Sequence, residues 1–253
     1  MRYIIGYLLC IGIGFHRVSG QPPGAERPSP WAAGIFVLSD SQPYKGAGRS
    51  VRILPSVTYR GERLQWNGPL VQYHLFKGDK STFSVNGVVQ FAPYEQDDAP
   101  ILEGMGDRST TFLAGVDWTY RPIPSLTILA SLDAEVLGAY NGAQAIAGFR
   151  YSIGKPWQRV SGSLGAGLLL QDQKWTRYFV GVPLEKATPE RPEYSPGDSL
   201  HYYTTAQLLI RIYGPWSLFT LARLEFLDET WRDSPLIADE YRLMVFSALN
   251  YSF

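Results

Sequence analysis

Long segments in which apolar and polar residues alternate dominate this chain, and they restrict its fold more than any other feature. The clearest is the last one, residues 241–253. Counting back in twos from Phe253, every residue is apolar or aromatic except Ser247. The intervening residues are more polar and include Arg242 and Asn250. A period of two indicates a β-strand with two different faces, so the chain is predicted to end on a two-faced strand with an aromatic last residue.

Ten further segments repeat this pattern along the chain, and most of them are long. A typical strand in a soluble protein has about 5–6 residues, whereas a tilted strand that crosses a membrane needs about 9–11. The connections alternate between short turns at 121–125, 154–157 and 214–215 and extended loops at 93–109, 172–199 and 228–240. Long strands with short turns at one end and long loops at the other are typical of bacterial outer-membrane barrels.

We therefore predict a single all-β domain over residues 31–253, a transmembrane antiparallel β-barrel. Single-chain bacterial barrels have an even number of strands. Dividing the segment at Asn67-Gly68-Pro69 gives twelve strands, which we favour, and omitting residues 31–38 gives ten. A soluble lipocalin-like barrel is the alternative, and its outer face would be polar. In the membrane barrel, Tyr251 and Phe253 are expected to form the assembly signal.

The start of the chain has the features of a secretory signal peptide over residues 1–20. Arg2 precedes an apolar run at 3–15, and the small residues of 18–20 suit cleavage. Cys10, the only cysteine, lies in the apolar run, so the mature chain is expected to have no disulfide. The proline-rich residues 21–30 are expected to form a periplasmic leader. These features predict export to the outer membrane of a Gram-negative cell.

The amino-acid composition indicates which partners and surroundings to expect for this chain. The formal net charge is zero, which gives no reason to expect nucleic acid. Sixteen Tyr and seven Trp with only 18% charged residues suit a chain that meets lipid interfaces. No apolar run approaches the ~20 residues of a transmembrane helix. Outer-membrane lipid and lipopolysaccharide are therefore the expected surroundings, and no oligomeric state is indicated.

The more polar row of each strand is predicted to face a lumen, and it carries charges of both signs. Two interpretations are open: paired charges that fill a narrow barrel, or a small aqueous path with a mild charge preference. About twelve strands enclose less space than the 16–18 strands of a porin, so we favour a plugged or narrow lumen. The candidate lumen residues are Asp117, Asp133, Glu135, Arg150, Arg211, Arg223, Glu225 and Arg242.

No catalytic residues, cofactor site or metal site are expected. Only His74 and His201 remain after removal of the signal peptide, and no H-x-x-x-H or C-x-x-C spacing occurs. Asp198, Ser199 and His201 contain the residue types of a hydrolase triad, but loop polarity is the simpler interpretation. The acidic loop 93–109 suits either divalent cations or plain solvation.

Several short motifs resemble the MipA/OmpV family of outer-membrane proteins. Pro43-Tyr44-Lys45-Gly46 is similar to an early family element, and Leu54-Pro55-Ser56-Val57-Thr58-Tyr59-Arg60 follows at the expected interval. Phe179-Val180-Gly181-Val182 is similar to a Y-F-G-V segment, with Phe and Val replacing Tyr and Phe. Asp233-Ser234-Pro235-Leu236 resembles a D-S-P-I/L element. The matching positions are Tyr44, Gly46, Pro55, Tyr59, Gly181, Val182, Asp233, Ser234 and Pro235.

The resemblance implies a non-enzymatic barrel. The family is named for MltA-interacting protein, which implies an envelope scaffold or interaction protein linked to peptidoglycan synthesis, with periplasmic murein enzymes as partners. A narrow substrate-selective channel and a surface adhesin are the alternatives.

Overall fold

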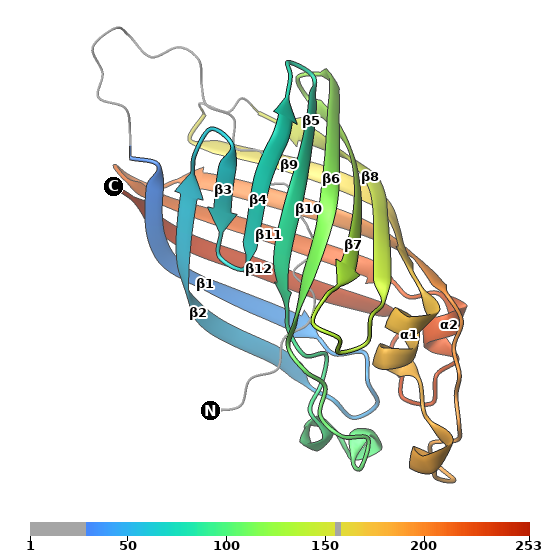
Figure 1. Cartoon of the computed structure of the whole chain (residues 1–253). Coiled ribbons are helices and arrows are strands. Elements are labelled where there is room, and N and C mark those ends of the chain that lie inside the picture. Colours follow the sequence, from blue (N-terminus) through green and yellow to red (C-terminus); the bar gives the residue numbers. More distant parts are fainter. Residues whose placement is uncertain (1–28, 155–157) are drawn as a thin grey trace, which may run out of the picture.

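A computed structural model describes residues 29–154 and 158–253. The predicted signal peptide, 1–20, and the leader up to residue 28 lie outside the described residues. The described chain forms one closed antiparallel β-barrel (Figure 1). None of the described helices combines the length and hydropathy needed to span a bilayer.

Twelve strands follow one another around the barrel, each pairing with its neighbours in sequence. The first and last strands close the ring, with Ile35 opposite Leu249. The predicted twelve-stranded membrane barrel is thus confirmed. The strands are β1 (Trp31–Ser41), β2 (Arg49–Arg60), β3 (Leu64–Asn67), β4 (Leu70–Lys77), β5 (Ser81–Gln90), β6 (Thr111–Ile123), β7 (Leu126–Glu135), β8 (Ala143–Ile153), β9 (Val160–Gln171), β10 (Ser199–Arg211), β11 (Trp216–Phe226) and β12 (Tyr241–Ser252).

The two faces of each strand differ as the alternation predicts. In β2, Ile53 is 67% exposed on the outer face, whereas its neighbour Arg52 is buried on the inner face. Leu132 and Leu164 are also more than half exposed. A soluble barrel would carry polar residues at such positions, but a membrane barrel needs an apolar band there. The apolar outer face therefore argues against a soluble, lipocalin-like barrel.

One end of the barrel has short turns, at 61–63, 78–80, 124–125 and 212–215, and we call it the short-turn end. The N-terminal end of β1 and the C-terminus lie there (Figure 1). Aromatic side chains pair near this end: Trp31 with Tyr59 at 4.6 Å between ring centroids, and Trp216 with Tyr251 at 5.2 Å. Such pairs are expected where a barrel meets a membrane interface.

The opposite, long-loop end carries the segments 42–48, 91–110, 136–142, 172–198 and 227–240. Five short helices form within these loops: η1 (Gln96–Asp98), η2 (Pro100–Leu102), α1 (Gln173–Val180), η3 (Leu184–Lys186) and α2 (Glu229–Arg232). In the loop 93–109, Asp97, Glu103 and Asp107 are exposed to solvent, but the loop is also packed, because Tyr94, Leu102 and Met105 are buried.

The hairpin of β3 and β4 is shorter than the others. Its turn at Gly68, with a positive φ of 58°, lies part-way along the barrel wall. Consequently β2 pairs with β1 along almost its whole length but with β3 only from Thr58 to Arg60. Figure 1 shows β2 separating from β5 on the long-loop side of this turn.

Candidate functional site: the lumen and its cap

The loops of the long-loop end fold together into one structure, which we call the cap. It comprises residues 42–48, 91–110, 136–142, 172–198 and 227–240. A single apolar cluster, including Tyr44, Tyr94, Trp175, Phe179 and Trp231, joins its segments to the upper wall of the lumen. The cap is therefore a packed core and not a set of independent loops.

Three of the motifs that resemble the family meet in this cap. The Tyr44 hydroxyl donates to the carbonyl oxygen of Phe179 at 3.3 Å. The amide of Lys45 donates to the carbonyl of Leu236 at 2.8 Å. The Ser234 hydroxyl donates to the carbonyl of Val180 at 2.7 Å. Segments about 50 to 190 residues apart in sequence are thus joined through backbone carbonyls, a contact that only the tertiary structure reveals.

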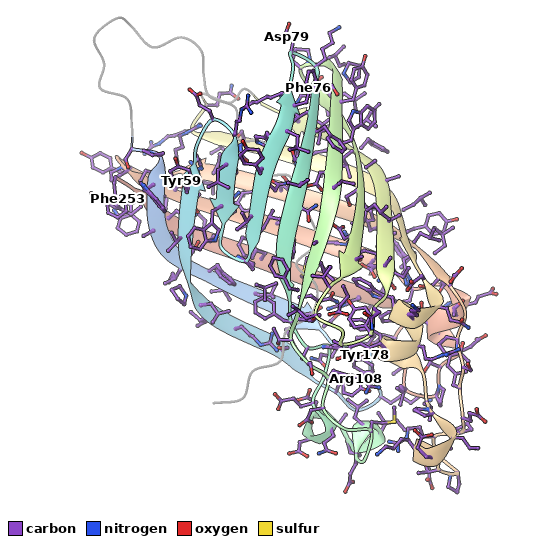
Figure 2. The ribbon with its side chains drawn as sticks, viewed as in Figure 1. Tyr59, Phe76, Asp79, Arg108, Tyr178 and Phe253 are labelled. Carbon is purple, nitrogen blue, oxygen red and sulfur yellow. The ribbon has the colours of Figure 1, made fainter. Side chains whose placement is uncertain are left out.

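The remaining motif positions have separate places. Gly46 has a φ of +78°, which favours glycine, and Val182 is buried. Gly181 ends α1, where a Cβ atom would come within 2.5 Å of the Arg177 carbonyl oxygen. Asp233 ends α2 and precedes the partly exposed Pro235. Pro55 is on the outer face of β2, and Tyr59 lies at the short-turn end (Figure 2).

Helix α1 supplies the aromatic part of the cap. It begins after Asp172, whose carboxylate accepts a hydrogen bond from the Trp175 amide at 2.8 Å, as expected of an N-cap residue. Trp175 and Phe179, one turn apart, stack at 5.7 Å. Phe179 in turn stacks on Trp231 from α2 at 6.1 Å, and Tyr140 meets Trp175 edge-on. This aromatic column fills the centre of the cap.

Two arginines tie the loops of the cap together. Arg108 lies 5.1 Å from the ring centroid of Tyr94 and 4.9 Å from that of Tyr178, and its Nε donates to the Tyr178 carbonyl at 2.9 Å. Figure 2 shows Arg108 and Tyr178 side by side at this end. Arg191 donates to the carbonyls of Ile101 and Glu103 at 2.6 and 2.9 Å. Both contacts join the β5–β6 loop to the β9–β10 loop.

Burial in the cap changes the ionisation of its tyrosines. It raises the pKa of Tyr94 to about 12 and the pKa of Tyr44 well above the usual value. Both hydroxyls therefore stay neutral further into the alkaline range than an exposed tyrosine would.

Below the cap, two ion pairs lie on the inner face of the barrel. Arg223 approaches Glu225 at 3.1 Å and stacks over the ring of Tyr203 at 4.0 Å. Arg242 holds Asp40 through two hydrogen bonds, of which the Nε to Oδ1 bond is 2.9 Å. Asp40 was not among the candidates because the first strand was expected to end at 38. Its even-numbered position, shared with Leu38, was the signal that it faces inward.

The other candidate lumen residues have varied surroundings. Asp117 accepts from Gln72 Nε2 at 2.9 Å, and the fully buried Asp133 accepts from Ser131 at 3.3 Å. The remaining three occupy three levels of the barrel: Glu135 accepts from the amides of Leu137 and Asn141 beneath the cap, Arg150 is half-buried on β8, and Arg211 is exposed at the short-turn end, where it donates to the Gln158 carbonyl.

A uniformly polar lumen is not what the structure has. An apolar cluster lines the inner face of the wall where the barrel closes, and we call it the apolar wall. The prediction of a polar inner row missed this cluster because β1, β11 and β12 carry large apolar residues on the same row as their charged residues. The apolar wall consists of Phe36, Leu38, Phe219, Leu221, Met244 and Ala248, with Leu54, Phe91, Leu209 and Phe246 packed against it.

His201 is a buried structural residue. The backbone amide of Asp228 donates to its Nδ1 at 3.2 Å, so Nε2 carries the proton and faces Gln171 Oε1 and Ser199 Oγ, each at 3.2 Å. A catalytic histidine needs the opposite arrangement, with a free Nε2 toward the serine. His201 is therefore unsuited to act as a general base, because its Nε2 carries the proton and its ring is fully buried. Within residues 29–154 and 158–253, no group of three His, Cys, Asp or Glu side chains is placed to hold a metal.

Comparison with known families identifies the chain. The family model described as MltA-interacting protein MipA matches residues 33–253. This chain belongs to the MipA family. MipA-family proteins from Escherichia coli K12 and Shigella flexneri, both called MltA-interacting protein, are each 23% identical over 254 residues, covering 97% of this chain and 98% of theirs.

Solved outer-membrane barrels are also similar. The CymD monoaromatic hydrocarbon channel is 10% identical, with a TM-score of 0.39, over 90% of this chain and 89% of its own. The N-terminal barrel domain of Pseudomonas aeruginosa OprF is 8% identical, with a TM-score of 0.31, over 90% of this chain and all of its own.

Proposed function

We propose that this MipA-family protein is a non-enzymatic barrel of the bacterial outer membrane that binds a murein-processing enzyme at its periplasmic end. The observation that carries the proposal is the cap, because a barrel whose long-loop end is closed by buried aromatic side chains is unsuited to general diffusion. Its full-length relatives are named for their interaction with MltA, which supports an enzyme of that type as the partner.

The orientation follows from the two ends. Outer-membrane barrels have short periplasmic turns and long external loops, so the cap would face outward and the short-turn end the periplasm. Tyr251 and Phe253 would then act as the assembly signal at the periplasmic edge. Their rings contact each other at 5.5 Å, and the Phe253 amide donates to the Trp31 carbonyl.

The periplasmic rim is basic, which favours an acidic partner surface or an anionic glycan strand. The turns and strand ends of the rim contain only two acidic residues among the described ones, Glu62 and Asp79. Figure 2 shows Asp79 at the tip of its turn. The basic residues are Arg60, Arg63, Lys77, Lys80, Arg121, Arg159 and Arg211.

Binding of an MltA-type lytic transglycosylase to the detergent-purified barrel tests this proposal. The double variant Arg63→Glu/Lys80→Glu should weaken binding at least ten-fold at low salt. The matched variant Lys174→Glu/Arg232→Glu, at the exposed surface of the cap, should bind like the wild type. Absence of binding by the wild type, or equal losses in both variants, would overturn the proposal.

A further inference from the structure

The hydrogen-bonded wall of the barrel is interrupted beside β2, and we call this break in strand pairing the opening. The last hydrogen bond between β2 and the β3–β4 hairpin runs from the Gly68 amide to the Val57 carbonyl, at 3.0 Å. Beyond it, toward the cap, residues 49–56 pair with β1 on one side but with no described strand on the other. Figure 1 shows the resulting separation of β2 from β5.

The free edge of β2 is built to stay unpaired. Val57 and Gly61 direct backbone groups to the β3 side, whereas Arg60 directs its amide to β1. Backbone hydrogen-bonding groups alternate between the two edges of a strand, so those of the odd-numbered residues of β2 point to the free edge. Pro55 is one of these residues, and it has no N–H group. Proline is found at strand edges because it removes a donor that an added strand would need. This disfavours a second copy of the chain, or a peptide strand, as the occupant.

The apolar wall lies directly inside the opening. Register places Phe36 opposite Leu54 on the neighbouring strand. A Cβ atom at Gly68 would lie only 3.7 Å from the Phe36 ring, so this ring adjoins the turn that bounds the opening. Phe36 meets Phe246 at 5.3 Å, and Phe246 meets Phe219 at 6.2 Å. These side chains are buried against one another, so a hydrocarbon chain that enters from the side would gain aromatic and aliphatic contacts by displacing part of this packing.

A cation lies at the same level. Arg52 pairs in register with Leu38 of the apolar wall. Its side chain is more than nine-tenths buried, yet neither of its terminal nitrogens has a hydrogen-bond partner. The neighbouring carboxylate of Asp40 is already held by Arg242. A buried guanidinium without such partners is costly, and its fork suits a carboxylate.

We propose that this opening admits an amphiphile with a long-chain tail and a carboxylate head, taken laterally from the membrane. Its head binds Arg52, and its tail lies on Phe36, Leu38 and Phe246. Outside the opening, Val51 and Ile53 are more than half exposed, which gives the tail an apolar approach. An open strand edge is not tolerated in pure hydrocarbon, so a polar head would also offer hydrogen-bond acceptors to the edge of β2 that lacks a partner strand. This site is independent of the periplasmic rim.

Equilibrium binding of oleate to the folded barrel in a non-ionic detergent tests the proposal, with oleyl alcohol as the uncharged probe. Arg52→Gln should weaken oleate binding at least ten-fold and leave oleyl alcohol binding unchanged. Phe36→Ala should weaken both probes. Arg121→Gln, a lumen arginine at the short-turn end, should change neither. Retention of heat-modifiable migration in unheated gels establishes that each variant is folded.

Three results would overturn the proposal: no saturable oleate binding by the wild type, equal oleate affinity of wild type and Arg52→Gln, or tighter binding of lipid A than of oleate with the same dependence on Arg52. The last would assign the opening to a phosphorylated membrane lipid.

Discussion

At the scale of single residues, the cap depends on side chains that satisfy distant backbone carbonyls. Ser234 illustrates this, because it is buried and donates to Val180, 54 positions earlier in the chain. Such a contact joins the β9–β10 and β11–β12 loops directly.

Ser234→Ala leaves the buried Val180 carbonyl without its donor, which costs about 1–3 kcal/mol. We expect faster amide hydrogen exchange and faster proteolysis in residues 172–198, with strand protection unchanged. Ser109→Ala is the control because its side chain is exposed. Equal exchange in Ser234→Ala and wild type would contradict this role.

Tyr94 gives the cap a dependence on alkaline pH. Its pKa is raised by burial from the ordinary value near 10 to about 12, so the folded cap binds the proton more tightly than the unfolded chain. Its contribution to stability is fully present below pH 10 and is lost as pH rises toward 12. Proteolysis of the cap by a protease that is active at alkaline pH should therefore increase across this window.

Tyr94→Phe retains most of the packing and should reduce that pH dependence. An identical alkaline transition in wild type and Tyr94→Phe would show that the other buried tyrosines govern it.

At the scale of elements, the strands were predictable and the cap was not. A strand of a membrane barrel records its two environments locally, because each residue faces either lipid or lumen. Cap contacts such as Tyr44 to Phe179 join segments 135 residues apart, and no local period encodes them. The short β3–β4 hairpin was visible only as a possible split at Asn67-Gly68-Pro69, and its effect on β2 depends on tertiary register.

The sequence pattern predicted which charged residues face the lumen, but it did not predict that part of the lumen is apolar. Arg223 and Glu225 are both odd-numbered, so the alternation put them on the same face of their strand, and the structure shows them paired. Phe219 and Leu221 are on that same face, but only its polar residues were taken as lumen candidates, so the apolar wall was not predicted. Asp40 was missed because strand ends are the least certain part of a pattern.

Helix α1 should depend on its N-cap. Asp172→Ala removes the acceptor for the Trp175 amide and costs about 0.5–2 kcal/mol. We expect increased amide exchange at the start of α1 and weaker protection of its aromatic column. Lys174→Ala, on the exposed face of the same helix, should change neither. An effect of Lys174→Ala equal to that of Asp172→Ala would indicate a general loss of helix propensity.

At the scale of the whole molecule, the cap and the ion pairs predict a closed barrel. The wild type should give no stable single-channel steps in planar bilayers, because the aromatic column and the paired charges obstruct the axis. Replacement of residues 173–193 by a short Gly-Ser linker should produce measurable conductance if the barrel remains folded. Stable steps from the wild type would contradict the plugged lumen.

Ring closure between β1 and β12 has a consequence for the order of folding. Ile35 and Leu249, which face each other there, are about 210 residues apart, so the entropic cost of closure is met only once nearly all of the chain is available. Until then both terminal strands expose unpaired edges that invite aggregation. The cap joins the β1–β2 loop to the β11–β12 loop through Lys45 and Leu236, so it also needs the first and the last parts of the chain to be in place. The cap is therefore expected to form last, after the ring has closed.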